Sequence, residues 1–183
     1  MLSRPTHIPE PEPVFASVKT FAPATVANLG PGFDFLGCAV DCLGDFVSLS
    51  VDFSVRPGKI AITQISGDAA GKLSRDPPSN CAGIAAIEVM NMLGIRSVGL
   101  SLSLEKGLPL GSGLGSSATN AAAGEIAVNE LFSRKLWKEE LELAGLKSGE
   151  KGWLRSDSKL RALGFEEIEF PWKERSLLCI GEP

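Results

Sequence analysis

The residues with the clearest chemical potential form a glycine-rich loop between an expected strand and an expected helix. The loop reads Leu108-Pro-Leu-Gly-Ser-Gly-Leu-Gly-Ser-Ser-Ala118, with glycine at every second position from 111 to 115. Glycine reaches positive φ without a steric penalty and lets a ligand approach the backbone closely. Ser116 and Ser117 follow at the expected helix N-terminus, where N–H groups and the helix dipole favour an anion. The segment predicts a phosphate site; the alternative is a flexible turn before a helix.

Two widespread phosphate loops do not fit this segment. A P-loop needs Gly-x-x-x-x-Gly followed by Lys and Ser or Thr, and no lysine follows these glycines. A dinucleotide-binding loop needs Gly-x-Gly-x-x-Gly and an acidic residue about 20 positions further on. The glycines here are spaced differently. Both classes of loop are therefore excluded.

A second group of polar residues lies near the N-terminus. Asn28 and Asp34 bracket a Leu-Gly-Pro-Gly turn. Both side chains can hydrogen-bond a polar small molecule, and the Asp34 carboxylate can hold an ammonium group. Asn and Asp also often satisfy the backbone of their own turn, which is the alternative here.

The elements that would position these loops are a mixture of strands and helices. Alternation of apolar and polar residues predicts strands over 14–26, 45–55, 60–65 and 98–104. The turn Arg56–Lys59 predicts that the second and third of these pair as a hairpin. Helices are predicted over 81–93, 116–132 and 137–144. Ser79 or Asn80 would cap the first helix, and Gly94 would end it.

Composition excludes several classes of protein. The 183 residues are 44% hydrophobic and carry a net charge of −4, which argues against a dedicated nucleic-acid binder. No apolar run approaches the ~18 residues of a membrane span. The only histidine is His7, so the four cysteines lack the partners of a structural zinc site and are expected to be small buried hydrophobes in a reducing compartment.

The charged residues divide the chain into unequal parts. Residues 1–132 hold 8 basic and 12 acidic side chains, whereas residues 133–183 hold 10 of each. All three tryptophans lie in the later part. This shift places a boundary within residues 133–152. Residues 1–13, rich in proline, are expected to form an extended and poorly ordered leader.

The two loops together are far more specific than either one alone. Pro-Ala-Thr-x-Ala-Asn-Leu-Gly-Pro-Gly-Phe-Asp, followed about 75 residues later by Pro-Leu-Gly-Ser-Gly-Leu-Gly-Ser-Ser-Ala, resembles the GHMP kinase superfamily. The first motif is similar to that of the homoserine kinase family, in its plant form. It argues against other superfamily members such as mevalonate kinases. The resemblance covers residues 14–151.

This resemblance implies an α+β fold and a kinase activity. The N-terminal domain of the superfamily resembles the second domain of ribosomal protein S5, and its C-terminal domain is ferredoxin-like. The family transfers the γ-phosphoryl group of ATP, with Mg²⁺, to the hydroxyl of L-homoserine on the way to threonine. Nucleic acid and membranes are not expected partners, and full-length members are expected to form homo-oligomers.

The resemblance also implies roles for particular residues. Ser117 matches a serine that contacts magnesium and phosphate, and Asn28 and Asp34 match positions that hold the amino-acid substrate, with Asp34 facing the ammonium. Glu150 lies near a magnesium-binding glutamate, with a solvated surface charge as the alternative. No catalytic residue is assigned. The residues expected to wrap the ATP phosphates are Pro109, Leu110, Gly111, Ser112, Gly113, Leu114, Gly115, Ser116, Ser117, Ala118 and Thr119.

The resemblance ends near residue 151. The family continues with Ser-Gly-x-His-x-Asp-Asn, which this chain lacks. Residues 152–183 are therefore expected to form an unrelated, poorly ordered tail, with the second domain missing and catalysis by the chain alone strongly impaired. The alternative function is that of a truncated or alternatively spliced, non-catalytic product, at most an interaction module. The plant-like motif predicts the plastid stroma if a transit peptide was lost upstream, and otherwise the cytoplasm.

Overall fold

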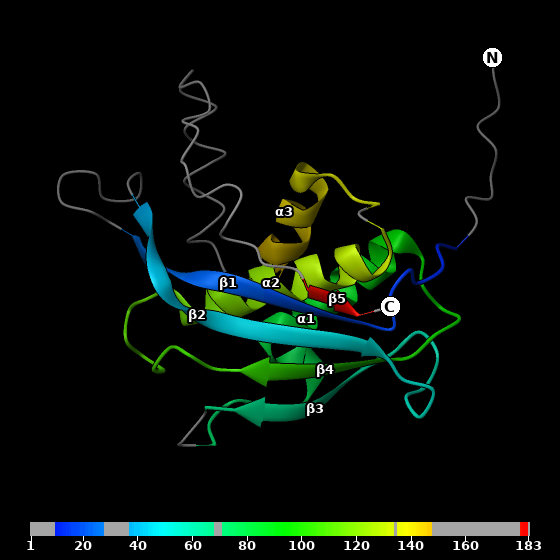
Figure 1. Cartoon of the computed structure of the whole chain (residues 1–183), viewed down its shortest axis with the longest axis horizontal. Coiled ribbons are helices and arrows are strands. Elements are labelled where there is room, and N and C mark those ends of the chain that lie inside the picture. Colours follow the sequence, from blue (N-terminus) through cyan, green and yellow to red (C-terminus); the bar gives the residue numbers. More distant parts are fainter. Residues whose placement is uncertain (1–9, 28–36, 68–70, 134, 148–179, 183) are drawn as a thin grey trace, which may run out of the picture.

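The computed structural model describes residues 10–27, 37–67, 71–133, 135–147 and 180–182. These residues form two layers, with a mixed sheet on one side and helices against one of its faces (Figure 1). The strand order in the sheet is β3-β4-β2-β1-β5. The mixture of strands and helices agrees with the α+β class expected from the resemblance.

The two longest strands form the centre of this sheet. Strand β1 (Ser17–Ala27) pairs antiparallel with β2 (Gly37–Val51), and the register shifts between Pro23 and Ala24. Strand β4 (Leu100–Glu105) lies on the other side of β2, also antiparallel. The predicted strands over 14–26 and 98–104 are thus present, whereas β2 begins and ends earlier than the prediction of 45–55.

The predicted hairpin between residues 45–55 and 60–65 is wrong. Strand β3 (Ile60–Ser66) pairs parallel with β4, and β4 separates it from β2. The connection crosses the start of β4, where the Asp52 N–H donates to Gly99 and the Gly58 N–H donates to Val98. A Cβ on Gly99 would lie 2.1 Å from the Val55 carbonyl oxygen, so only glycine permits this crossing.

Helix α1 (Cys81–Leu93) has the ends that the sequence predicts. The Asn80 side chain accepts a hydrogen bond from the Ala82 N–H, and Gly94 ends the helix at a φ of 71°. A short 3-10 helix, η2 (Pro77–Ser79), leads into it. Helix α2 (Ser116–Leu131) packs closely on α1 at Gly124, where a Cβ would lie 2.7 Å from the Ala82 oxygen.

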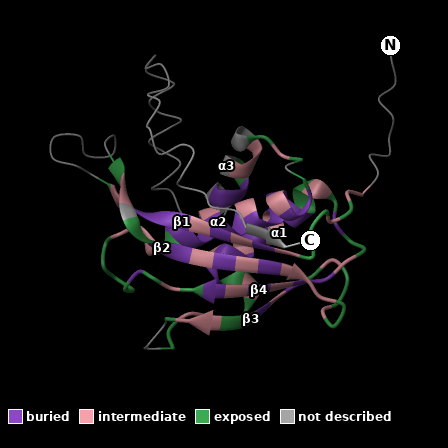
Figure 2. Cartoon of the chain, in the orientation of Figure 1, coloured by how far each residue is buried: buried purple, intermediate pink, exposed green. Residues whose placement is uncertain are grey.

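The hydrophobic core lies between the sheet and these two helices. Buried and partly exposed residues alternate along β2, as expected for a strand with one covered face (Figure 2). Thr20 joins the layers, because its hydroxyl donates to the Val47 carbonyl of β2 and the Ala123 carbonyl of α2. The larger buried side chains of the core are Val47, Leu49, Val89, Leu100, Leu102, Leu104, Val128, Leu131 and Phe132.

The remaining elements attach to the edges of this core. Helix α3 (Lys138–Lys147) contacts α1 and α2, and it lies within the predicted boundary region of 133–152. Strand β5 (Ile180–Glu182) pairs antiparallel with the start of β1. Residues 148–179 are outside the described residues, so the tail expected over 152–183 stays a prediction. No helix within the described ranges is long and apolar enough to cross a membrane.

Candidate functional site

The glycine-rich loop joins β4 to α2 and adopts the backbone that its glycines permit. Gly111 and Gly113 have φ values of 75°, and Gly115 has a φ of 68°. A Cβ on Gly111 or Gly113 would meet no atom within 4 Å. The first two glycines are therefore required by backbone conformation and not by crowding within the protein, and their surface is exposed.

At position 115, glycine is required both by the positive φ and by crowding within the protein. A Cβ there would lie 2.2 Å from the Thr25 hydroxyl oxygen on β1. The Thr25 N–H donates to the Leu114 carbonyl at 3.0 Å. These contacts fix the end of the loop against the end of β1.

Helix α2 begins directly at the loop without a side-chain cap. Gly115 occupies the N-cap position and has no side chain to accept a bond from the first turn. The first N–H groups of a helix lack intrahelical partners, and they carry the positive end of the helix dipole. Ser117 is exposed at this end. The arrangement suits an anion that brings its own acceptor oxygens.

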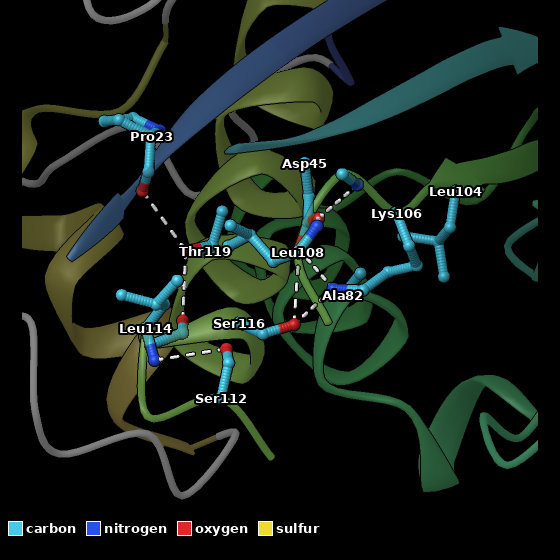
Figure 3. A network of polar contacts seen from close by, with 12 residues as sticks. Pro23, Asp45, Ala82, Leu104, Lys106, Leu108, Ser112, Leu114, Ser116 and Thr119 are labelled. Carbon is cyan, nitrogen blue, oxygen red and sulfur yellow. Dashed lines mark hydrogen bonds and ion pairs between the residues drawn. The ribbon is translucent and has the colours of Figure 1, made fainter. Parts of the chain in front are cut away.

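Thr119 connects the helix back to the first strand (Figure 3). Its hydroxyl donates at 3.2 Å to the Pro23 carbonyl and at 3.0 Å to the Gly115 carbonyl. Together with the Thr25–Leu114 bond, this places the described part of the first motif, Pro23–Ala27, directly against the second motif. Asn28, Asp34 and Glu150 lie outside the described residues, so their predicted roles stay predictions.

A buried charged pair under the loop was not predicted from the sequence. Lys106, the residue after β4, pairs with Asp45 of β2, and their side chains are 1% and 0% exposed. The Lys106 ammonium also donates to the Ser116 hydroxyl at the start of α2. The other oxygen of the carboxylate, Oδ1 of Asp45, accepts from the N–H groups of Gly107 at 2.8 Å and Leu108 at 3.0 Å (Figure 3).

The register of the strands held a signal for this pair. Asp45 shares its strand face with Val47 and Leu49, and Lys106 continues the buried series of Leu102 and Leu104. A charged side chain at a core position of a strand needs a partner, because unpaired charges are almost never fully buried. The alternation of residues 45–55 by itself predicts a strand and does not identify the partner of Asp45.

The described residues do not form a metal site of their own. No group of three or more His, Cys, Asp or Glu side chains within the described ranges is arranged to hold a metal ion. Of the cysteines in the described residues, Cys81 is partly buried. Cys38 and Cys42 are exposed, so the expectation that these cysteines are buried hydrophobes is wrong for both, because they lie on the part of β2 that extends beyond the helices.

This geometry can be compared with known proteins. The family of GHMP kinases N terminal domains matches residues 80–153, a range that includes α1, β4, the loop and α2. A homoserine kinase of Arabidopsis thaliana is 71% identical over 142 residues, which are 78% of this chain and 38% of the relative.

Solved structures agree with this family match. The homoserine kinase of Cytophaga hutchinsonii superimposes with a TM-score of 0.68 at 41% identity, over 74% of this chain and 41% of that one. The mevalonate kinase of L. major superimposes with a TM-score of 0.59 at 18% identity, over 81% of this chain and 48% of that one. The latter likeness concerns the fold alone.

The fold and the loop before α2 thus define the N-terminal domain of a GHMP kinase. The chain spans about 40% of the length of the homoserine kinases it matches. Over 78% of its length, its sequence is similar to homoserine kinases, with 71% identity to the plant relative.

Proposed function

We propose that this chain provides the ATP-binding part of a homoserine kinase, which transfers the γ-phosphoryl group of ATP to the hydroxyl of L-homoserine. The observation that carries the proposal is the loop of three positive-φ glycines at the uncapped N-terminus of α2. The 71% identity to a homoserine kinase over the same residues supports this choice of substrate.

The loop would act by holding the phosphates. Phosphoryl transfer has a loose transition state, so catalysis depends mainly on positioning and on compensation of negative charge. The backbone N–H groups of the loop and of the first turn of α2 that have no partner within the protein would be donors that need no reorganisation when the phosphates arrive. Exposed Gly111 and Gly113 leave room for a close approach of the phosphate oxygens.

The residues at the start of α2 fit a magnesium ion that binds together with the nucleotide. Mg²⁺ usually keeps several waters and takes few protein ligands besides the phosphates. The exposed Ser117 hydroxyl offers one such ligand, and Glu150 is the proposed second. When bound, Mg²⁺ neutralises charge on the phosphate oxygens.

The amino-acid substrate would bind beside the end of β1. Thr25 lies three positions before Asn28 in the sequence, and its N–H donates to the Leu114 carbonyl of the glycine-rich loop. In a protein that also carries the second kinase domain, Asp34→Asn should raise the KM for homoserine by roughly one to two powers of ten, the effect of losing one charge-assisted contact. The KM for ATP should change little, and an equal rise in both values would contradict the role of Asp34.

The cellular location and the assembly of the protein are also part of the proposal. The identity to the Arabidopsis thaliana relative supports the plant form of the family, for which we infer a location in the plastid stroma. Homo-oligomers are proposed for full-length members.

The proposal is tested with purified chain, ATP, Mg²⁺ and a coupled assay for ADP release. Calorimetry should detect binding of Mg-ATP. ADP release by the chain alone should be at least tenfold slower than by an intact homoserine kinase, because one side of the substrate would be unheld. Absence of Mg-ATP binding would contradict the nucleotide site. Release stimulated by mevalonate and not by homoserine would contradict the substrate.

A further inference from the structure

The geometry points to Asp45 as a positioning residue that holds both ends of the glycine-rich loop in place. This inference rests on the proposed nucleotide site. It concerns a carboxylate on β2 that does not itself belong to the loop.

One carboxylate joins the entrance and the exit of the loop. Oδ1 of Asp45 accepts from the N–H groups of Gly107 and Leu108, where the chain leaves β4. Oδ2 contacts the Lys106 ammonium, and the Ser116 hydroxyl donates to it at 3.4 Å. Lys106 also donates to the Ser116 hydroxyl, so two hydrogen bonds, one with Asp45 and one with Lys106, hold the first turn of α2. The segment from 108 to 116 is thus fastened at its two ends.

Close backbone packing places Asp45 under the loop. A Cβ on Gly107 would lie 2.2 Å from the Gly44 carbonyl oxygen, and a Cβ on Gly44 would lie 2.2 Å from the Ala22 oxygen. The backbones of β1, β2 and the loop entrance therefore approach one another at this level. Only glycine allows this approach, which brings the Asp45 carboxylate within reach of the loop.

Asp45, Lys106 and Ser116 form a cluster under the loop. Its two opposite charges leave the proposed anion site without added net charge. An unpaired Asp45 carboxylate would compete for the positive end of α2 and repel a phosphate. An unpaired Lys106 ammonium would lie unfavourably at the same helix end. Paired, the two charges cancel, so the N–H groups of the loop remain the donors available to a ligand. The cluster therefore positions the loop without occupying it.

The test compares two double variants of the 183-residue chain. Asp45→Asn/Lys106→Met removes both charges together, so no uncompensated charge is buried. The new amide side chain still offers an oxygen to the Gly107 and Leu108 N–H groups. Lys19→Met/Glu105→Gln removes the exposed pair on the same sheet, which is the matched control. Both variants and the unmodified chain are studied by amide hydrogen exchange without ligand, and by calorimetry with Mg-ATP and with adenosine.

The first variant should exchange faster at residues 109–118, with exchange in the core strands unchanged. Its Mg-ATP affinity should fall about tenfold, which is the effect of losing one hydrogen bond to a charged group. Adenosine affinity should not change, because adenosine has no phosphate for the loop to hold. A general folding defect would weaken both ligands. The control variant should match the unmodified chain in every measurement.

Either of two results would overturn the inference. Unchanged exchange in the loop would show that the cluster does not order it, whatever the affinity does. Faster exchange with unchanged Mg-ATP affinity would show that the cluster stabilises the fold without positioning the phosphate site. If the unmodified chain bound no Mg-ATP, the proposed function would fail. The exchange data would then still decide whether Asp45 orders the loop.

Discussion

Glu105 and Lys106 are neighbours in sequence, yet they form ion pairs on opposite faces of the sheet. Glu105 pairs with Lys19 at 2.8 Å on the face without helices, where the two side chains are 47% and 36% exposed. Lys106 pairs with Asp45 on the covered face, where both side chains are almost fully buried. Each pair joins a lysine ammonium to a carboxylate, and the two pairs differ mainly in their access to water.

This difference decides what each pair contributes. Water screens the exposed pair, so it adds little to stability even though the Lys19 ammonium also lies 4.7 Å from the centre of the Phe46 ring. In the buried pair, each charge depends on the other to offset its lost hydration. We therefore expect removal of a single partner to have very different effects on the two faces.

The largest effect should follow from Lys106→Met. This change leaves the Asp45 carboxylate buried without its counter-charge and should lower the free energy of unfolding by about 3–5 kcal/mol. Glu105→Gln, one position away, should lower it by less than about 1 kcal/mol. Urea unfolding of both variants measures the contrast. Adding Asp45→Asn to Lys106→Met should recover part of the lost free energy of unfolding. Similar losses for Lys106→Met and Glu105→Gln would contradict the proposed difference between the two faces.

A smaller loss should follow from Gly115→Ala, which tests how tightly the covered face holds the loop. The new Cβ would collide with the Thr25 hydroxyl at a positive φ, so we expect a loss of about 1–3 kcal/mol. Gly94→Ala is the control, because Gly94 has a similar φ of 71° but no atom within 4 Å of the added carbon. Its loss should be about 1 kcal/mol, from backbone strain alone. Equal losses would show that the Thr25 contact is unimportant.

The smallest effect concerns Glu10, a partly exposed residue whose carboxylate is held in place by hydrogen bonds. Its side chain accepts from the Ser97 hydroxyl at 2.6 Å and from the N–H groups of Ser97 and Arg96 at 2.7 Å. These bonds, that from the Ser97 hydroxyl first, lower the pKa of Glu10 below its usual value of 4.5.

A lowered pKa in the folded state means that the charged form stabilises the fold. The stabilisation is present above the unfolded-state pKa of 4.5 and is lost as the pH falls through the lower pKa of the folded state. Glu10→Gln should therefore be less stable than the unmodified chain at pH 7, by less than about 1 kcal/mol, and equal to it at strongly acidic pH. Thermal unfolding at both pH values tests this, and a difference that grows in acid would refute the sign.

The sequence predicted the parts of the molecule that depend on local chemistry. Asn80 and Gly94 mark the ends of α1 because capping is decided within one turn of the helix. Glycines at alternate positions predicted the positive φ values of the loop for the same reason.

The parts that the sequence did not predict depend on contacts between distant segments. Strand β4 lies between β2 and β3, where Leu100, Leu102 and Leu104 are buried. The turn at Arg56–Lys59 carries no information about this placement. Asp45 and Lys106 meet across 61 positions of sequence. Their strand registers indicate that both are buried, but not that each is the partner of the other.

The most direct test of the central claim, that the loop before α2 binds the phosphates of a nucleotide, is calorimetry of Mg-ATP with Gly113→Val and Gly94→Val. Both glycines have positive φ and open space around the added carbon, so the backbone strain is matched. Only Gly113 belongs to the proposed phosphate site. We predict that Gly113→Val abolishes detectable binding, whereas Gly94→Val binds Mg-ATP as the unmodified chain does. Equal affinity of the unmodified chain and Gly113→Val would contradict the claim.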